Sequence, residues 1–128
     1  MTLDDDFRGH LPLAPHVFQI LLSLLEGELH GYALLKDITE RTDGEVALGT
    51  STLYAAVQRL LKEGFLEEAD PPAEDESRGP PRKYFRITRA GRALTRAEAQ
   101  RVGRLHRQVA RSGLVDALGA AGGGEEGS

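Results

Sequence analysis

Residues 49–64, GTSTLYAAVQRLLKEG, place hydrogen-bonding and cationic side chains on one face of an expected helix. Apolar residues recur at the i, i+4, i+7 and i+8 spacing of an amphipathic helix: Leu53, Val57, Leu60 and Leu61. At 3.6 residues per turn, the opposite face holds short polar and basic side chains and no acid: Ser51, Thr52, Ala55, Gln58, Arg59 and Lys62. Such groups can hydrogen-bond to base edges and neutralise phosphates. The pattern indicates a nucleic-acid contact, although an ordinary amphipathic helix with a solvated face shares it.

Each polar side chain has an expected role. Base reading is expected at the groove-facing end of the helix, because Gln pairs with adenine and Arg with guanine: Thr50, Ser51, Thr52, Gln58 and Arg59. Phosphate contacts are expected from basic residues of the helix and of a hairpin that follows it: Arg59, Lys62, Arg78, Arg82 and Lys83. Tyr54 lies between the two faces. It is either a phosphate donor or a helix-packing tyrosine with an exposed tip.

Residues suited to catalysis do not form a recognisable site. The chain has no cysteine, which excludes disulfides, thiolate metal sites and cysteine nucleophiles. The histidines have neither metal-ligand spacing nor a placed carboxylate partner: His10, His16, His30 and His106. The sequence has no phosphate-binding glycine loop and no nucleophile elbow. We therefore expect no enzyme activity, no metal and no cofactor, and we interpret His30 as a turn residue bonded to backbone.

Length and composition indicate one domain with a modest, mostly aliphatic core. The 128 residues are 40% hydrophobic, 28% charged and only 5% aromatic. No apolar run approaches the roughly 18 residues of a membrane span. The acidic N-terminus, MTLDDDFRGH, lacks the pattern of a signal peptide. A cytoplasmic protein without a membrane partner is expected.

The net charge of −4 conceals a strong asymmetry. Residues 1–77 carry 5 basic and 16 acidic side chains, whereas residues 78–112 carry 11 basic and 1 acidic. A strongly basic segment in an acidic protein is typical of a polyanion-binding surface. An arginine-rich helix exposed to solvent would show the same pattern.

Three helices are expected to form the frame. Pro15 suits the first turn of a helix that runs to about Glu26. A turn at residues 27–31 leads to a second helix over about 31–41, and residues 45–50 connect it to the helix described first. In that third helix Ser51 is expected to cap the start and Gly64 to end it. Together these elements predict a helix-turn-helix core.

A wing and a final helix are expected to complete the fold. Residues 65–69 and 82–88 are rich in strand-forming side chains, and a Pro/Gly-rich tip at 70–81 joins them. The tip is acidic at residues 70–76, so only its basic side is expected to approach DNA. Thr88 can cap a helix from Arg89 to about Arg111, with seven arginines around an incomplete apolar stripe.

Two apolar surfaces exceed what a small core needs. The helix from Pro15 has a very wide apolar arc, and the arginine-rich helix needs a surface on which to pack. We therefore expect both to contact a second subunit, through these residues: Val17, Phe18, Leu21, Leu22, Leu25, Leu94, Val102, Leu105 and Val109. The alternative for the first helix is a fully buried helix in a monomer. The arginines either flank DNA or neutralise acidic residues of the partner, and we favour the second interpretation for most of them.

The ordered set of motifs resembles the PadR family of bacterial winged-helix transcriptional regulators over about residues 11–112. The matching residues are His30-Gly31-Tyr32, Gly49-Thr50, Thr52-Leu53-Tyr54, Val57, Arg59-Leu60, Glu63-Gly64-Phe65-Leu66, Arg82 to Thr88, and Ala90-Gly91. The resemblance implies a homodimer, formed through the first and last helices, that binds operator DNA, usually as a repressor. The chain departs from the family where Ala55-Ala56 replaces a proline that often follows the Leu-Tyr pair. Its short C-terminal part lacks a larger effector-sensing domain, so any effector must bind at the dimer interface.

The expected fold is mainly α with a small β-hairpin: a winged helix-turn-helix with an N-terminal and a C-terminal dimerisation helix. Four segments are expected: a flexible arm at 1–13, the DNA-binding domain at 14–88, the dimerisation helix at 89–114 and a flexible tail at 115–128. The expected function is that of a homodimeric repressor on palindromic double-stranded DNA, released by a small-molecule effector. The alternative is a winged-helix module that binds protein and no operator.

Overall fold

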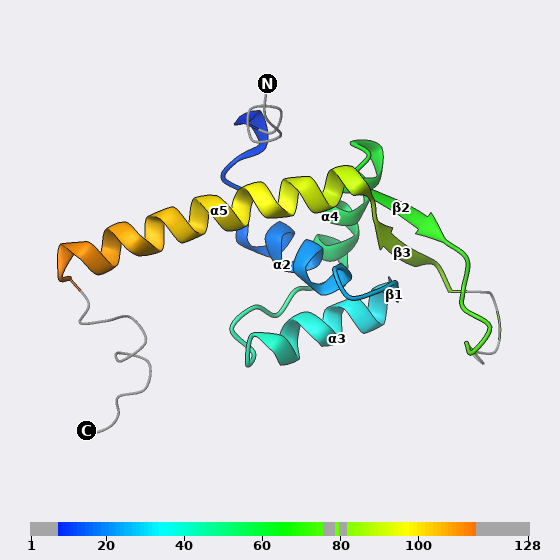
Figure 1. The fold of residues 1–128 in the computed structure, drawn as a ribbon. Coiled ribbons are helices and arrows are strands. Elements are labelled where there is room, and N and C mark those ends of the chain that lie inside the picture. The colour runs from blue at the N-terminus through cyan, green and yellow to red at the C-terminus, as the bar shows by residue number, and fades with distance from the viewer. Residues whose placement is uncertain (1–7, 76–78, 80–81, 115–128) are drawn as a thin grey trace.

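The structure is a computed structural model that describes residues 8–75, 79 and 82–114. Its elements follow each other in this order: η1 (Arg8–His10), α2 (Pro15–Leu24), β1 (Leu29–His30), α3 (Gly31–Arg41), α4 (Thr50–Lys62), β2 (Leu66–Ala69), β3 (Tyr84–Ile87) and α5 (Arg89–Ser112). The first part of α5 packs over α2, and its second part projects beyond the domain (Figure 1). The strands β2 and β3 extend from the other end of the domain as the wing (Figure 1).

The helix ends show which local signals operate. Gly64 follows α4 with a φ of 85°, and Thr88 caps α5 by accepting a hydrogen bond from the Gly91 N–H at 3.0 Å; both were predicted. The prediction that Ser51 caps α4 is wrong. Gly49 is the N-cap and no side chain caps the helix, because α4 begins at Thr50 and Ser51 already lies in its first turn.

A small antiparallel sheet closes one side of the core. Its strand order is β1-β3-β2, with Leu29 opposite Phe85 and Leu66 opposite Ile87. The sequence predicted the β2–β3 hairpin but assigned β1 to a turn. The described residues therefore form four α-helices and a three-stranded sheet, in a winged-helix arrangement.

The core joins all the elements around one apolar cluster. Its fully buried side chains come from four helices and one strand: Ile20, Leu21 and Leu24 of α2, Leu34 and Ile38 of α3, Leu53 and Val57 of α4, Phe85 of β3 and Leu94 of α5. Leu11 and Leu13 pack against this cluster, and the ring of His10 lies edge-on to Phe65 at 5.2 Å between centroids. Residues 10–13 thus contact the domain, whereas a flexible arm was expected over residues 1–13.

Two glycines allow elements to approach closely. A Cβ on Gly31, at the start of α3, would lie 1.9 Å from the hydroxyl oxygen of Tyr54. A Cβ on Gly91, in the first turn of α5, would lie 2.1 Å from the carbonyl oxygen of Phe65. Glycine at these positions lets α4 pack on α3, and lets α5 pack on the chain between α4 and the wing.

Candidate nucleic-acid interface

The exposed face of α4 carries the polar residues that were predicted from the sequence to contact DNA. Leu53, Val57 and Leu60 are buried, and the opposite side chains are all exposed: Thr50, Ser51, Thr52, Gln58, Arg59 and Lys62. Among the described residues, no ion pair engages Arg59 or Lys62. The two cations are therefore available to an outside anion.

The wing presents a second group of cationic side chains, which differ in how closely carboxylates pair with them. Arg86 lies in the middle of β3 between two carboxylates, with its Nε 2.8 Å from Glu67 and its Nη1 2.9 Å from Glu28. These hydrogen bonds, that to Glu67 first, raise the pKa of Arg86. Lys83 is more open, with its Nζ 3.8 Å from Glu68 and 70% of its side chain exposed. Arg82 is exposed as well, and the remaining predicted contact, Arg78, lies outside the described residues.

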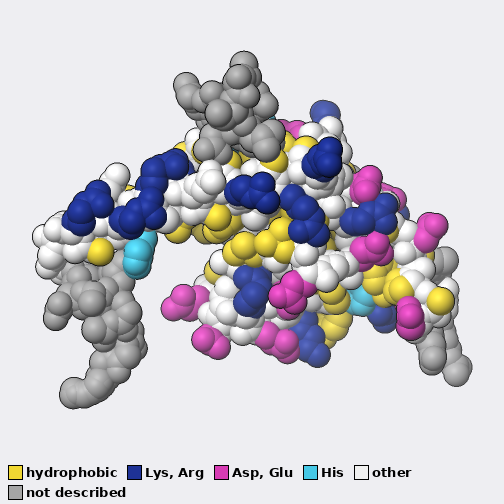
Figure 2. Space-filling model, in the orientation of Figure 1, with side chains coloured by type: hydrophobic (Ala, Val, Ile, Leu, Met, Phe, Trp, Pro, Cys, Tyr) yellow, Lys and Arg dark blue, Asp and Glu magenta, His cyan; other side chains and the backbone are white. Residues whose placement is uncertain are grey.

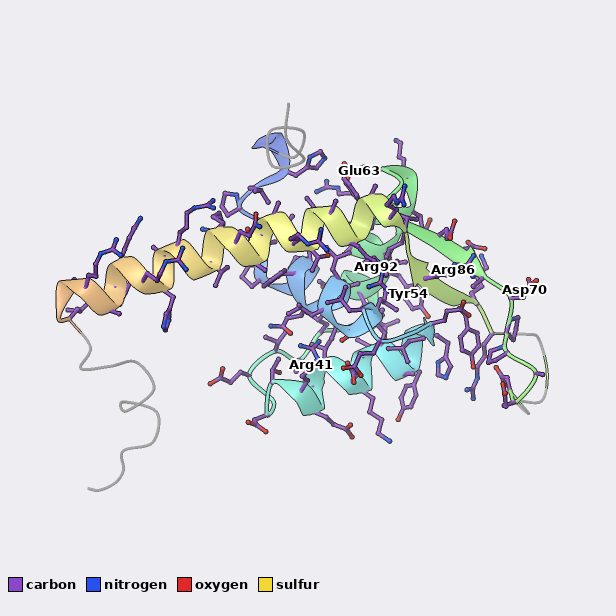
Figure 3. All side chains as sticks on the ribbon, in the orientation of Figure 1. Arg41, Tyr54, Glu63, Asp70, Arg86 and Arg92 are labelled. Atoms are coloured by element: carbon purple, nitrogen blue, oxygen red, sulfur yellow. The ribbon has the colours of Figure 1, made fainter. Side chains whose placement is uncertain are left out.

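Tyr54 connects α4 with the start of α3 (Figure 3). Its ring lies edge-on to Phe85 at 6.5 Å between centroids, and the residue is 38% exposed. Tyr54 can therefore be both a helix-packing residue and a phosphate donor, because its ring packs between elements while part of the residue faces solvent.

His30 joins α3 to the wing. Its Nδ1 accepts a hydrogen bond from the Ala33 N–H at 3.2 Å and so caps α3, in agreement with the interpretation as a turn residue bonded to backbone. Its Nε2 lies 2.8 Å from Nη1 of Arg82, a contact that the sequence did not reveal. Burial, then the positive charge of Arg82, lowers the pKa of His30 below its usual value of 6.5. The imidazole is therefore neutral near pH 7.

The acidic part of the wing tip also contacts the residues around His30. The ring of Tyr84 lies edge-on to His30, and its hydroxyl donates a hydrogen bond to Asp75 at 2.8 Å. Burial, followed by this hydrogen bond, raises the pKa of Tyr84. The tip residue Asp75 is thus anchored to β3.

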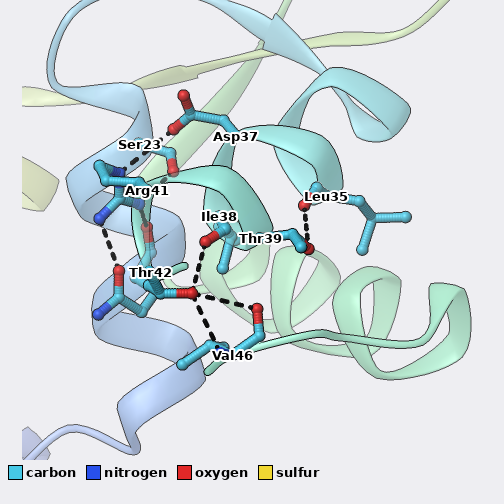
Figure 4. A network of polar contacts seen from close by, with 9 residues as sticks. Ser23, Leu35, Asp37, Ile38, Thr39, Arg41, Thr42 and Val46 are labelled. Atoms are coloured by element: carbon cyan, nitrogen blue, oxygen red, sulfur yellow. Dashed lines mark hydrogen bonds and ion pairs between the residues drawn. The ribbon is translucent and has the colours of Figure 1, made fainter. Parts of the chain in front are cut away.

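A network of hydrogen bonds around Arg41 holds α3 against α2 (Figure 4). The Arg41 guanidinium donates to the side-chain and main-chain oxygens of Gln19, at 2.6 and 3.0 Å, and to Ser23 Oγ at 2.5 Å. It also pairs with Asp37 at 3.4 Å. The i, i+4 spacing of Asp37 and Arg41 was a signal for the ion pair, but nothing local in the sequence marks the contacts between helices.

The predicted dimer residues divide into two groups. Leu21 and Leu94 are 0% and 1% exposed within one chain, so their assignment to a dimer interface was wrong: the protomer core already covers them. The other residues retain exposed surface: Val17, Phe18, Leu22 and Leu25 on α2, and Val102, Leu105 and Val109 on α5. Leu105 is 48% exposed on the projecting part of α5, and nothing in the described chain packs on that part.

The arginines of α5 form a basic face (Figure 2). Arg96, Arg104 and Arg107 line one shallow hollow along the helix, together with Gln100 and Gly103. Arg101 differs, because it forms two hydrogen bonds with the buried carboxylate of Glu98 at 2.7 and 2.9 Å. In the same view, acidic side chains gather over α3 and the wing (Figure 2).

The described part of the chain has neither a metal-binding cluster nor a membrane-spanning helix. Residues 8–75, 79 and 82–114 contain no group of three His, Cys, Asp or Glu side chains able to hold a metal ion. No helix in these same ranges has both the length and the apolar character needed to cross a bilayer.

Comparison with known proteins identifies the family. The model of the transcriptional regulator PadR-like family matches residues 20–97, more than half of the chain. The chain belongs to this family. An uncharacterized protein of Lysinibacillus sphaericus is 38% identical to this PadR-family chain over 93 residues, which cover 73% of the chain and 78% of the relative.

Solved structures show the same fold. A transcriptional regulator from Clostridium thermocellum superposes with a TM-score of 0.62 at 27% identity, over 87% of this chain and 99% of that one. The PadR of Bacillus subtilis, solved in complex with operator DNA, superposes with a TM-score of 0.57 at 22% identity. That match covers 66% of this chain and 46% of the Bacillus protein. The family and these neighbours are transcriptional regulators rather than enzymes, and the chain is a PadR-family transcriptional regulator with a winged-helix fold.

Proposed function

We propose that this regulator is a homodimeric repressor that acts in the cytoplasm, binds a palindromic operator in double-stranded DNA and is released by a small-molecule effector. The observation that carries the proposal is the exposed, acid-free face of α4, with Gln58, Arg59 and Lys62. A face of this chemistry fits the major groove, where amide and guanidinium groups read base edges. The Bacillus subtilis PadR crystallised with operator DNA shares the fold and supports this reading.

The wing supplies the second half of the contact. Arg82 and Lys83 lie where the chain enters β3, and neither is held between two carboxylates as Arg86 is. Basic groups at this edge fit the sugar-phosphate backbone beside the groove that α4 enters. The proposed DNA contacts are thus Thr50, Ser51, Thr52, Tyr54, Gln58, Arg59, Lys62, Arg82 and Lys83, with Arg78 outside the described residues.

A second subunit fits the apolar surface left on α2 and α5. Val102 and Leu105 are 40% and 48% exposed on a helix that projects from its own domain. Burying such side chains against a partner is favourable by about 25 cal/mol for each Å² removed from water. A two-fold dimer places two α4 helices roughly 10 bp apart, which matches a palindromic site.

An effector site fits beside the same surface. A groove of about 350 Å³ lies between α2 and α5, and its lining combines apolar side chains with two guanidinium groups: Leu22, Leu25, Arg92, Thr95, Arg96 and Ala99. Arg92 already donates a hydrogen bond to the Leu25 carbonyl at 3.1 Å, which links the two helices (Figure 3). A small molecule bound there would change the packing of α2 on α5 and hence the separation of the two α4 helices.

Binding of the purified protein to DNA upstream of its own gene tests the proposal. The measurement is a titration of that duplex over a series of salt concentrations, with the molar mass measured by light scattering. Tight, salt-sensitive binding by a species of twice 13.9 kDa supports a dimeric regulator. A dimer that binds neither this duplex nor other promoter fragments, even at low salt, refutes operator binding.

The acidic exposed face of the wing favours a second candidate, a module that binds protein. Glu67 and Glu68 remain exposed on β2 although they pair with Arg86 and Lys83, and Asp70 follows them at the end of the strand (Figure 3). Such a face repels phosphate and fits a basic protein surface. This candidate predicts a chain that binds no operator at any salt concentration, so the same titration separates the two.

A further inference from the structure

The contact between α3 and the wing has more donors than acceptors. A neutral imidazole offers one lone pair and one N–H group. Around His30, the Ala33 N–H points at Nδ1 and an Arg82 N–H group lies at Nε2, 3.2 and 2.8 Å away. If the ring accepts from Ala33, its own proton is on Nε2 and faces the Arg82 guanidinium. If it accepts from Arg82, the proton on Nδ1 faces the Ala33 N–H. In either tautomer one of these two donors has no acceptor on the ring, although Arg82 also hydrogen-bonds to the Tyr84 hydroxyl.

Another donor lies beside this cluster. The Tyr54 hydroxyl sits against Gly31, the residue next to His30, and no described residue accepts a hydrogen bond from it. The contact of His30 with Arg82 lies at the surface, so an anion from solvent can reach it. Donors from His30 at the end of β1, from Arg82 just before β3 and from Tyr54 of α4 therefore lie around the start of α3.

The acidic group nearest to this junction does not resolve the excess of donors. Asp75 raises the pKa of His30, but burial and Arg82 outweigh it, and the pKa stays below its ordinary value. The carboxylate of Asp75 accepts instead from the Tyr84 hydroxyl at 2.8 Å. The ring of His30 thus remains neutral and retains an N–H group to donate.

We propose that His30 and Arg82 together bind one phosphate of the operator backbone, with the Tyr54 hydroxyl donating to the same phosphate or its neighbour. This site rests on the proposed operator binding and assigns His30 a role in it. A phosphate oxygen accepts several hydrogen bonds and carries negative charge, so it supplies the acceptors that the junction lacks. His30 ends β1 and caps α3, and Arg82 lies just before β3, so the phosphate binds where the start of α3 meets the wing.

His30→Ser is the test variant, because serine is a good N-cap that keeps the acceptor for the Ala33 N–H but cannot reach the Arg82 position. We expect its affinity for the upstream duplex to fall about a hundredfold, as for the loss of one hydrogen bond to a charged group in each subunit of the dimer. The salt slope should stay unchanged because His30 is neutral. Arg82→Ala should instead lower the slope by about 2 in a dimer that loses two phosphate contacts. Both effects should be equal on a random duplex, since phosphate contacts do not read sequence.

Three further variants complete the test. The double variant of His30→Ser and Arg82→Ala should lose less affinity than the product of the single losses, because both residues bind one phosphate. His30→Asn, which caps the helix and has an N–H donor, should recover part of the affinity. His106→Ser, at an exposed position of α5, is the matched control and should bind like the wild type.

The outcomes separate this site from the proposed function. Wild-type affinity in a folded His30→Ser variant overturns the phosphate site and leaves His30 as a helix cap alone. A loss that is identical in His30→Asn and His30→Ser, with a lowered melting temperature in both, also overturns it, because capping would then explain the result. If the wild-type protein binds no duplex, operator binding fails and the phosphate site fails with it.

Discussion

Replacing Arg59 and Lys62 of α4 by alanine tests the recognition face directly. Both side chains are exposed, and neither forms an ion pair among the described residues. Their removal should leave the core intact, since the buried face of α4 is formed by Leu53, Val57 and Leu60. The expected change is therefore in DNA affinity and its salt dependence rather than in folding.

The magnitude follows from the number of phosphates neutralised. Each neutralised phosphate contributes about 0.9 to the slope of log affinity against log salt concentration. The double substitution removes two cations from each subunit, so a dimer should lose about 3.6 from the slope. Between about 50 and 200 mM salt, the wild-type affinity should then fall about 150-fold more than that of the variant.

The assay is a titration of the labelled upstream duplex at several salt concentrations, with circular dichroism and light scattering as checks on fold and mass. Arg104→Ala with Arg107→Ala is the matched control. It removes the same charge from the exposed face of α5, a separate element, and should keep the wild-type slope. An equal loss of slope in both double variants would show that overall charge governs binding, and would refute the assignment of α4 as the recognition helix.

Other predictions concern stability, assembly and pH. Gly91→Ala should destabilise the fold by about 1–3 kcal/mol, because its Cβ would meet the Phe65 carbonyl at 2.1 Å, whereas Gly103→Ala, whose nearest neighbour is 3.6 Å away, should stabilise it by about 1 kcal/mol. Thermal melts of the two variants should move in opposite directions, and two similar melting temperatures would contradict the close approach. Leu22→Glu should reduce the mass in sedimentation to that of a 13.9 kDa protomer, and a dimer that persists would exclude α2 from the interface. Because the folded state lowers the pKa of His30 below 6.5, the unfolded chain takes up the proton first as pH falls below that value. Stability should drop as pH falls through about 6.5, and less so in His30→Ser; identical pH dependence in both chains would contradict this role of His30.

The parts of the fold that the sequence predicted are those set by local signals. The bounds of α3, the end of α4 at Gly64 and the start of α5 at Thr88 depend on caps and turn residues within a few positions. The strand β1 could not be found in this way, because it has two residues and exists only through its pairing with β3. The start of α4 was also missed. Ser51 has the right chemistry for a cap, but the chain enters the helix one residue earlier.

The sequence predicted which face of α4 is exposed, but it did not predict which side chains contact one another around the site. Helical periodicity alone separates the exposed residues of α4 from Leu53 and Val57. Periodicity cannot tell which part of a wide apolar arc faces the core, so Leu21 and the adjacent Leu22 were given the same role although only Leu21 is fully buried. The contact of His30 with Arg82 spans 52 residues and required the folded chain.

The two faces of α5 bear on the interpretation of its arginines. At 100° per residue, Arg96, Arg104 and Arg107 cluster about half a turn away from Val102, Leu105 and Val109. A partner subunit that packs on the apolar strip therefore leaves the arginine face outside the interface. The acids that were expected to need a partner's arginines are also partly compensated within the chain, since Glu28 pairs with Arg86 and Asp37 with Arg41. In the proposed dimer this arginine face therefore stays exposed to solvent and is not neutralised by the partner's acidic side chains.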